Sequence, residues 1–378
     1  MASCSPDFYV RDCLRKEVES ATAGRNTIVR DILGNPHWMY VLRKFRLEDF
    51  GLGEGVHPAF FIREREVDEI LVGKYQASRG SVGMASSVAG KLPWTRIPMI
   101  DASNACRAMG RNFFLPSNAV YAANALRLLK DCGNRHYAGN TNYGRDVLCH
   151  WMIGDLNTRT YMPGDRRLNG PENNWEGGLT LTGSGGDDWN DDGTSSGIAD
   201  LVGNAWEWCS GFRILDGEIQ VMEANNSMSS EADLSAESPE WKGMLQDGSL
   251  VHPGIEGTLK YAAPSEGNGE KVNVGSARID TEIKFKIKPR GYMTDAFANL
   301  SAADGIVVPL EAKALGLFPM QSEGVKGSYW IRNYGEMMPV RGGGDWSDGF
   351  GAGPFAFFAY HGREMRDFKF TFRIAYVP

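Results

Sequence analysis

Residues Pro339 to Pro378, PVRGGGDWSDGFGAGPFAFFAYHGREMRDFKFTFRIAYVP, join a glycine-rich start to two segments that alternate between apolar and polar positions. A two-residue period is typical of β-strands, because successive side chains point to opposite faces of a sheet. In the first segment Phe355, Phe357 and Ala359 share one face. In the second segment one face carries Phe368, Phe370, Phe372 and Ile374, and the other carries Asp367, Lys369, Thr371 and Arg373. The stretch therefore predicts turns followed by two strands, each with one face toward a core.

Aromatic side chains also occupy the second face of the first strand, where a single core does not need them. These are Phe358 and Tyr360, and Phe350 in the preceding turn is a further aromatic residue. Aromatic residues beside polar ones are typical of recognition surfaces. A sheet buried on both faces also carries aromatics on both sides, so the residue types alone leave both interpretations open.

The clearest single motif lies earlier in the chain, as GIADLVGNAWEW at residues 197–208. Trp206 and Trp208 stand two residues apart, so both would face the core of a strand while Glu207 points away. Asn204 follows a glycine, which suits a tight turn. We expect this motif to be scaffold rather than a ligand contact.

Several residues in a fixed order resemble the C-terminal half of the C-type lectin-like fold used by formylglycine-generating enzymes. They resemble more closely the variable proteins of diversity-generating retroelements found in phages and bacteria. The pattern D-L-x-G-N-x-W-E-W at residues 200–208 is shared with both groups. The chain departs from the pattern by one extra residue before Trp346 and by Thr371, where these families usually have glycine. The other matching residues are Arg341-Gly-Gly, Trp346, Ala352-Gly353, Phe355-Ala-Phe357, Arg363 and Phe372-Arg373-Ile-Ala.

The resemblance implies an α+β chain with a C-type lectin-like fold of the formylglycine-generating-enzyme type. Mixed antiparallel sheets, two flanking helices and a large insertion would build it. The implied segments are an N-terminal extension over residues 1–55, a lectin-like domain over 56–378, an insertion over 222–325 and a variable ligand-binding region over 339–378. From its low hydrophobicity, we expect the insertion to be a surface excursion of strands and short helices.

Local patterns predict individual elements independently of the resemblance. Capping residues and helix-stop glycines bound helices at 98–110 and 117–130, and residues 10–21 predict a third helix. Residues 212–221 predict a hairpin around Asp216-Gly217. Residues 282–288 alternate as a strand whose outer face carries Lys284, Lys286 and Lys288, and we expect those lysines to face solvent rather than bind an anion.

In the resembling proteins a reverse-transcriptase system rewrites chosen positions of the variable region by substitution at adenines, and the rewritten side chains bind the ligand. The sequence therefore predicts a protein or cell-surface ligand held on a solvent-exposed face. Phe350, Phe358 and Tyr360 would be rigid aromatic anchors, and Met365 a soft filler. The polar contacts would come from Asp345, Ser347, Asp348, His361, Asp367 and Lys369.

The genetic code separates the candidate residues that adenine substitution can produce from those that it cannot. Substitution in the first two bases of an Asn codon reaches Phe, Tyr, His, Asp and Ser, but it does not reach Met or Lys. Met365 and Lys369 therefore do not fit that rule, whereas the other aromatic and polar candidates tested against it do. Fixed scaffold positions would be Arg341, Trp346, Phe355 and Arg373.

Residues 133–197 are dense in Gly, Asn and Asp, which predicts loops. Within them Asp188, Asn190 and Asp192 match the first half of a calcium-binding loop. The twelfth loop position, where a bidentate Glu is needed, is Ala199 with Asp200 beside it. An Asx-rich turn fits better, and Ca²⁺ held by Asp188, Asn190 and Asp192 is the alternative. No other cofactor is predicted.

An enzyme of the formylglycine-generating type is the main functional alternative, and the sequence disfavours it. Those enzymes hold copper with a pair of cysteines near the C-terminal end of the fold, whereas the last cysteine here is Cys209. Related iron enzymes use a His-rich site, and the six histidines of this chain show no such spacing. We predict a binding protein rather than an enzyme, and a structural virion or surface protein without variable binding is the third possibility.

Composition limits the partners. The chain has 378 residues and a formal net charge of -7, which argues against a nucleic-acid or anionic-membrane partner recognised through bulk charge. No apolar run approaches membrane-spanning length, and the start MASCSPDFYV lacks the hydrophobic region of a signal peptide. Together with the resemblance, this predicts a phage tail-associated or bacterial-surface protein without membrane insertion. The oligomeric state is open, because the resembling proteins include monomers and trimers.

Overall fold

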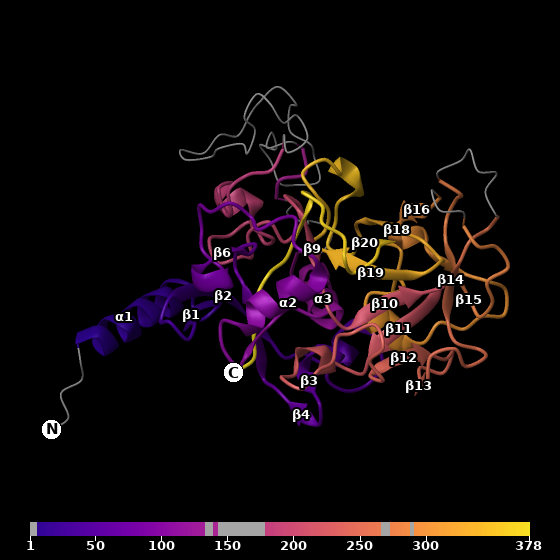
Figure 1. Cartoon of the computed structure of the whole chain (residues 1–378), viewed down its shortest axis with the longest axis horizontal. Helices are drawn as coiled ribbons and strands as arrows, with labels where there is room; N and C mark the ends of the chain where they lie inside the picture. Colours follow the sequence, from indigo (N-terminus) through magenta and orange to yellow (C-terminus); the bar gives the residue numbers. More distant parts are fainter. Residues whose placement is uncertain (1–5, 133–138, 143–177, 266–272, 288–290) are drawn as a thin grey trace.

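The structure, a computed structural model, describes residues 6–132, 139–142, 178–265, 273–287 and 291–378. It is a mixed α+β fold in which strands predominate, with four α-helices among the described residues. Two sheets of five and thirteen strands contain most of the strands. Figure 1 shows α1, β1 and β2 at one end, β10 to β15 of the larger sheet at the other, and α2 and α3 between them.

The elements fall mainly in the positions that the local patterns predict. The helices are α1 (Pro6–Ala21), α2 (Met99–Arg107), α3 (Asn118–Cys132) and α4 (Leu310–Ala314). The 3-10 turns are η1 (Leu47–Phe50), η2 (Pro58–Phe60), η3 (Ser81–Gly83), η4 (Gly186–Trp189), η5 (Asn226–Met228), η6 (Phe297–Asn299) and η7 (Gly349–Gly351). The three predicted helices are thus confirmed as α1, α2 and α3. Of the predicted loop segment 133–197, residues 133–138 and 143–177 lie outside the described residues. No helix in the described part of the chain is long and apolar enough to cross a membrane.

The smaller sheet joins the two ends of the described chain. Its strands, in spatial order, are β1 (Asn26–Arg30), β2 (Pro36–Arg43), β5 (Glu69–Gly73), β22 (Ala375–Tyr376) and β8 (Phe113–Phe114), all antiparallel. Residues 26–43 therefore belong to the same sheet as the last strand. The predicted boundary at residue 55 does not coincide with a break in this sheet.

The larger sheet runs in the order β16-β18-β20-β19-β10-β11-β14-β15-β17, with β9, β12, β13 and β21 paired at its side. Its strands are β9 (Trp206–Trp208), β10 (Phe212–Leu215), β11 (Glu218–Met222), β12 (Trp241–Met244), β13 (Leu250–Val251), β14 (Lys260–Ala262), β15 (Arg278–Asp280), β16 (Met293–Ala296), β17 (Ser301–Ala302), β18 (Ser328–Ile331), β19 (Glu336–Arg341), β20 (Phe357–His361) and β21 (Phe370–Thr371). Two further pairs, β3 (Phe61–Ile62) with β4 (Arg65–Glu66) and β6 (Ser78–Arg79) with β7 (Ala85–Ser86), stand apart. The predicted hairpin is confirmed as β10–β11, and both Asp216 and Gly217 at its turn have positive φ.

The 222–325 segment is not the surface excursion that its composition suggested. It supplies β12 to β17, which extend the larger sheet. Tyr261, Met293 and Phe297 are fully buried in the same core cluster as Ile214 and Phe357 of the sheet's other strands. The segment is part of the core because these few large apolar side chains complete it, even though the rest of the segment is polar.

The strand predicted at 282–288 does not form, since residues 281–287 pair with no neighbouring strand. The alternation of exposure is nevertheless present, with Lys284 and Lys286 exposed. The Asn333 side chain replaces a strand partner: its amide nitrogen donates to the Phe285 carbonyl at 2.8 Å, and its oxygen accepts from the Ile287 amide at 2.9 Å. Alternating exposure and an apolar inner face can therefore exist without strand pairing.

The main core lies between the two sheets and is filled by α3. Tyr40 and Leu42 of β2, Phe212 of β10 and Phe357 of β20 belong to one buried cluster with most of the apolar residues of α3. Because α3 is apolar on most sides, it packs against both sheets at once. The C-terminal segment, yellow in Figure 1, passes from β20 and β21 of the larger sheet to β22 of the smaller one.

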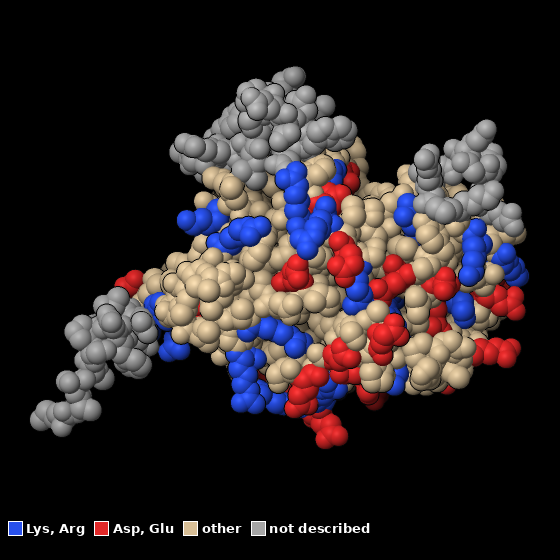
Figure 2. Space-filling view, in the orientation of Figure 1, with Lys and Arg blue, Asp and Glu red and all other residues tan. Residues whose placement is uncertain are grey.

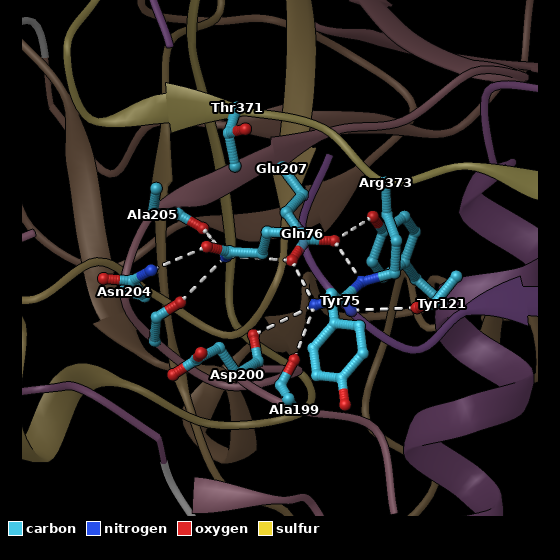
Figure 3. Close-up of polar contacts among 12 residues, drawn as sticks. Tyr75, Gln76, Tyr121, Ala199, Asp200, Asn204, Ala205, Glu207, Thr371 and Arg373 are labelled. Carbon is cyan, nitrogen blue, oxygen red and sulfur yellow. Dashed lines mark hydrogen bonds and ion pairs between the residues drawn. The ribbon is translucent and has the colours of Figure 1, made fainter. Parts of the chain in front are cut away.

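A buried ion pair fixes this passage. Glu207 and Arg373 are both 0% exposed, and two bonds join them, from Nη2 to Oε1 at 2.7 Å and from Nε to Oε2 at 3.0 Å. The Tyr121 hydroxyl of α3 donates to Glu207 at 2.5 Å, and the Gln76 amide donates to it at 3.0 Å (Figure 3). Burial alone would lower the pKa of Arg373, but the Glu207 carboxylate raises it above its usual value. Glu207 points away from the tryptophans, as predicted, but into a second buried region.

We expect Glu207→Ala to destabilise the fold by about 3–5 kcal/mol, because it leaves the Arg373 guanidinium buried without its carboxylate. Chemical denaturation followed by circular dichroism would measure the free energy of unfolding. Glu66→Ala is the matched control: its carboxylate pairs with Lys44 at the surface, where solvent screens the pair, so we expect little change. Equal stability of the two variants would contradict the role given to Glu207.

Candidate ligand-binding face

The outer surface of β16, β18 and β20 carries Phe358 and Tyr360, the half-buried aromatic residues that the sequence predicts for the second face of β20. The strand register places Thr294, Trp330 and Phe358 side by side. On β20, Phe357 and Ala359 are fully buried, whereas Phe358 and Tyr360 are only half-buried. The predicted alternation is therefore confirmed for this strand, and the sheet buries one face fully and the other only in part.

We call Tyr292, Trp330, Phe358, Tyr360 and His361 the aromatic face. Phe358 lies at its centre, with ring centroids 6.0 Å from Trp330, 5.3 Å from Tyr360 and 5.6 Å from His361. Tyr292 meets Tyr360 edge-on at 5.6 Å. These separations are those of favourable aromatic pairs, so the rings support one another and form a continuous half-exposed surface.

One cation stands on the aromatic face. The guanidinium carbon of Arg332 lies 3.3 Å from the ring centroid of Tyr360. Its Nε donates to the Gly291 carbonyl at 3.2 Å and its Nη1 to the Tyr360 carbonyl at 3.3 Å. Burial and the nearby Arg332 charge lower the pKa of His361 to about 4, so its imidazole is neutral at neutral pH. Among the described residues, the face therefore combines neutral aromatic groups with the positive charge of Arg332.

Polar atoms of the aromatic face have no partner within the described part of the chain. No hydrogen bond there uses the Trp330 indole nitrogen, the Tyr292 or Tyr360 hydroxyl, or the His361 ring. Each of these groups can donate or accept a hydrogen bond. The aromatic face can thus offer both apolar contact area and several free hydrogen-bonding groups.

Phe350 extends this surface at one edge. It is 73% exposed and lies on η7. The neighbouring Gly351 packs so closely on the Trp330 ring that an added Cβ would lie 3.3 Å from the indole. The turn therefore carries Phe350 to the border of the aromatic face.

Four of the predicted polar contacts bond to one another instead of forming an open surface. The Lys369 ammonium lies 2.9 Å from an Asp345 carboxylate oxygen and donates to the Ser347 hydroxyl at 2.7 Å. Asp345 in turn accepts from the Ser347 amide at 2.7 Å, and Asp348 accepts from the Asp345 amide at 2.6 Å. Burial, together with the Asp345 charge, raises the pKa of Asp348 to about 7. These bonds hold the 345–348 turn in shape.

The last two candidates lie in the turn after β20. Met365 is partly buried against the second core cluster. The Asp367 carboxylate accepts from the Lys369 amide at 2.8 Å, and the Asp367 carbonyl accepts from the Arg96 amide at 3.0 Å. The predicted residues thus form three neighbouring groups: the aromatic face with Phe350, the 345–348 turn with Lys369, and the 365–367 turn.

Two of the three residues proposed for calcium, Asn190 and Asp192, already have other partners. Asp188 is exposed, whereas the Asp192 carboxylate accepts from the Thr194 amide at 2.9 Å and pairs with Arg25 at 3.1 Å. The Asn190 amide donates to the Thr194 carbonyl at 2.7 Å. These bonds form the Asx-rich turn. Among the described residues, no group of three or more His, Cys, Asp or Glu side chains could hold a metal ion, and the Ca²⁺ alternative stays a prediction.

Sequence reasoning missed Trp330, Arg332 and Tyr292. The segment SYWIRNY at 328–334 alternates, with Tyr329 and Ile331 fully buried and Trp330 and Arg332 on the outer face. That alternation was readable in the sequence, since a Trp and an Arg opposite two apolar residues indicate an accessible second face. These side chains lie outside residues 339–378 but share their surface.

Comparison of the sequence with known proteins does not assign the chain to a family. No protein-family model matches the chain, and no curated protein matches it either.

We expect Asp348→Asn to stabilise the fold at about pH 8 by at least about 1 kcal/mol. The folded protein binds the Asp348 proton more tightly than the unfolded chain does, so stability falls as the pH rises from 3.8 to about 7. Asn removes that loss and should change little at about pH 4, where the carboxyl is already protonated. Unfolding curves at the two pH values would measure both effects.

The matched control is Asp345→Asn, which removes the carboxylate paired with Lys369. We expect it to lower stability at about pH 8, because the Lys369 ammonium then loses its counter-charge. The assignment of Asp345 as the partner of Lys369 would be contradicted if Asp345→Asn stabilised the fold. The raised pKa of Asp348 would be contradicted if Asp348→Asn did not increase stability at about pH 8.

Proposed function

We propose that this chain binds a protein or cell-surface ligand through the aromatic face, and that a diversity-generating retroelement varies positions on and around that face. In this proposal the scaffold is a C-type lectin-like fold, and the protein acts on a phage particle or a bacterial surface. The alternation of buried and accessible residues in the C-terminal stretch carries the proposal.

The residues that the resemblance implies as fixed scaffold have buried side chains. Arg341, Trp346, Phe355 and Arg373 are all buried. Arg341, for example, donates from Nε and Nη2 to the Asn118 side chain at 2.9 and 2.7 Å, and from Nη2 to the Gly316 carbonyl at 2.9 Å. Any change there would break bonds between distant segments.

The aromatic residues implied as variable lie on the accessible side. Phe350 is exposed, and Phe358, Tyr360 and His361 are half-buried. The three half-buried rings contact one another, and Phe358 and His361 also contact the buried Phe370. Substitution of Phe350 or Tyr360 would alter the surface without removing a ring from a core cluster, whereas Phe358 also packs against the second core cluster. A scaffold that tolerates change at its surface suits a protein whose ligand contacts are rewritten.

The chemistry of the aromatic face suits a protein ligand. Tyr, Trp and Arg are the residues most often found where a protein interface concentrates its binding energy. Large rings provide contact area with little loss of conformational entropy on binding. Arg332 and the free polar atoms of the rings would then orient the ligand.

A catalytic role has weaker support. Cys209, the last cysteine of the chain, is fully buried, and burial raises the pKa of its thiol to about 12. A thiol in that state is neither a nucleophile nor a metal ligand at neutral pH. This supports a binding role over the cysteine-dependent oxidation of the formylglycine-generating enzymes.

Adjacent residues of β20 test the division between core and face. We expect Phe357→Ala to cost about 3–5 kcal/mol of stability, because it opens a cavity in the main core. Phe358→Ala should cost about 1–2 kcal/mol, since its ring is only half removed from water. Thermal and chemical unfolding of the two variants would measure this; equal losses would mean that both sides of the strand are structural.

Sequencing the 3′ end of the gene in many isolates tests the function itself. We expect substitutions to concentrate at the codons of the 339–378 stretch that adenine substitution can reach, while Trp346, Phe355 and Arg373 stay unchanged. Those codons are the ones for Ser347, Asp348, Phe350, Phe358, Tyr360, His361 and Asp367. A near-copy of this DNA beside a reverse-transcriptase gene, differing at adenines, should accompany them. Scattered substitutions without such a copy would favour a fixed-ligand or structural role.

A further inference from the structure

A second surface feature, which we call the basic cleft, gathers cations around Trp94. Two adjoining hollows of about 490 and 460 Å³ share Arg79, Trp94 and Arg96 as lining residues. Arg366 borders the first hollow and Lys91 the second. Among the described residues that line them, the one acidic side chain is Asp101, 3.2 Å from Arg366. This local excess of positive charge contrasts with the net charge of -7 of the whole chain.

The position of the basic cleft is visible on one side of the molecule. Figure 2 shows Lys and Arg side chains gathered over the region where Figure 1 places β6. β6 itself contributes Arg79, whose guanidinium carbon lies 4.5 Å from the ring centroid of Trp94. Within the described chain, no ion pair joins Arg79 or Lys91 to an acidic side chain. Both cations are therefore available to an external anion.

The strand register brings two loop tips to the same end of this feature. β6 pairs with β7, so residues 80–84 form the connecting tip. On the other side of β6, Ser78 forms an antiparallel bridge to Pro93, which puts residues 91–92 beside that tip. Two backbone hydrogen bonds hold the second tip in place. The Gly90 amide donates to the Thr182 carbonyl at 2.7 Å, and the Thr182 amide donates to the Lys91 carbonyl at 2.9 Å.

Both tips present aliphatic side chains to solvent. Val82 is 88% exposed and Leu92 is 52% exposed. Val82 also has a φ of 50°, in the left-handed region that β-branched residues avoid. Strain of this kind persists where the surrounding structure imposes it and is frequent at functional sites. An exposed, strained valine needs an explanation that packing within the chain does not give.

We propose that the basic cleft and its two tips dock the protein on the surface of an anionic lipid bilayer. Arg79 and Lys91 would bind the lipid phosphates, and Val82 and Leu92 would enter the boundary between head groups and acyl chains. Trp94, half-buried and lining both hollows, is of the residue type enriched at that boundary. A soluble polyanion would use the cations equally well but would leave Val82 and Leu92 in water, so the lipid surface accounts for more of the observed features. The proposed contact is peripheral, since single side chains such as Val82 and Leu92 reach only the head-group boundary.

Vesicle co-sedimentation with the full chain tests this proposal. Vesicles of phosphatidylcholine alone are compared with vesicles containing about one third phosphatidylglycerol, an anionic lipid. We expect binding to the anionic vesicles to be at least about tenfold tighter and to weaken as salt is added. Arg79→Glu combined with Lys91→Glu should weaken it by at least about tenfold.

Two further variants separate docking from general effects. Val82→Gly should weaken vesicle binding by about threefold or more while the melting temperature holds or rises, because glycine adopts positive φ without strain. Lys284→Glu with Lys286→Glu makes the same charge change on exposed residues elsewhere and should alter binding by less than about twofold.

Three results would overturn the proposal. The first is equal binding to neutral and anionic vesicles. The second is equal weakening by the two double variants, which would indicate bulk charge rather than a site. The third is binding of dextran sulfate, lost in the Arg79 and Lys91 variant, without binding to anionic vesicles, which would assign the basic cleft to a soluble polyanion.

Discussion

The rest of the structure depends on the buried pair of Glu207 and Arg373. Glu207 belongs to the central motif at 200–208, and Arg373 lies in the C-terminal segment, between the larger sheet and β22. Around the pair gather the Tyr121 hydroxyl of α3 and the backbone carbonyls of Gly73 and Ala199, each within 3.0 Å of a bonded partner. A charge pair without water is stable only when every remaining donor and acceptor is satisfied. That requirement fixes the positions of both sheets and α3 relative to one another.

The sequence predicted the parts of the fold that follow from local chemistry. The helices around residues 99–107 and 118–132 and the 212–222 hairpin depend on caps, periodicity and turn residues, and these act over a few residues. The burial of Glu207 was not readable, because its partner lies 166 residues away. Nor was the role of the 222–325 segment, since a few dispersed residues such as Tyr261 and Phe297 decide it while the average composition is polar.

The candidate site shows the same division. Alternation along β20 was sufficient to place Phe358 and Tyr360 on the outer face. It could not show that Asp345, Ser347 and Lys369 bond to one another, because that requires two turns to meet. The aromatic face also includes Trp330 and Arg332, from a strand that pairs with β20 in parallel and so comes from elsewhere in the chain. A surface built by tertiary pairing cannot be read from one segment.

The path of the C-terminal segment has a consequence for synthesis on the ribosome. β20 and β21 complete one sheet and β22 completes the other, so the larger sheet lacks a strand until residue 371 has left the exit tunnel and the smaller sheet until residue 376 has left it. Contacts of such long sequence separation form slowly, because a large loop must close before they stabilise anything. The nascent chain must therefore carry β5 and β8 without β22, the strand that lies between them, for most of translation. Such a chain invites aggregation, and its yield in a cell should depend on chaperones that hold it until synthesis ends.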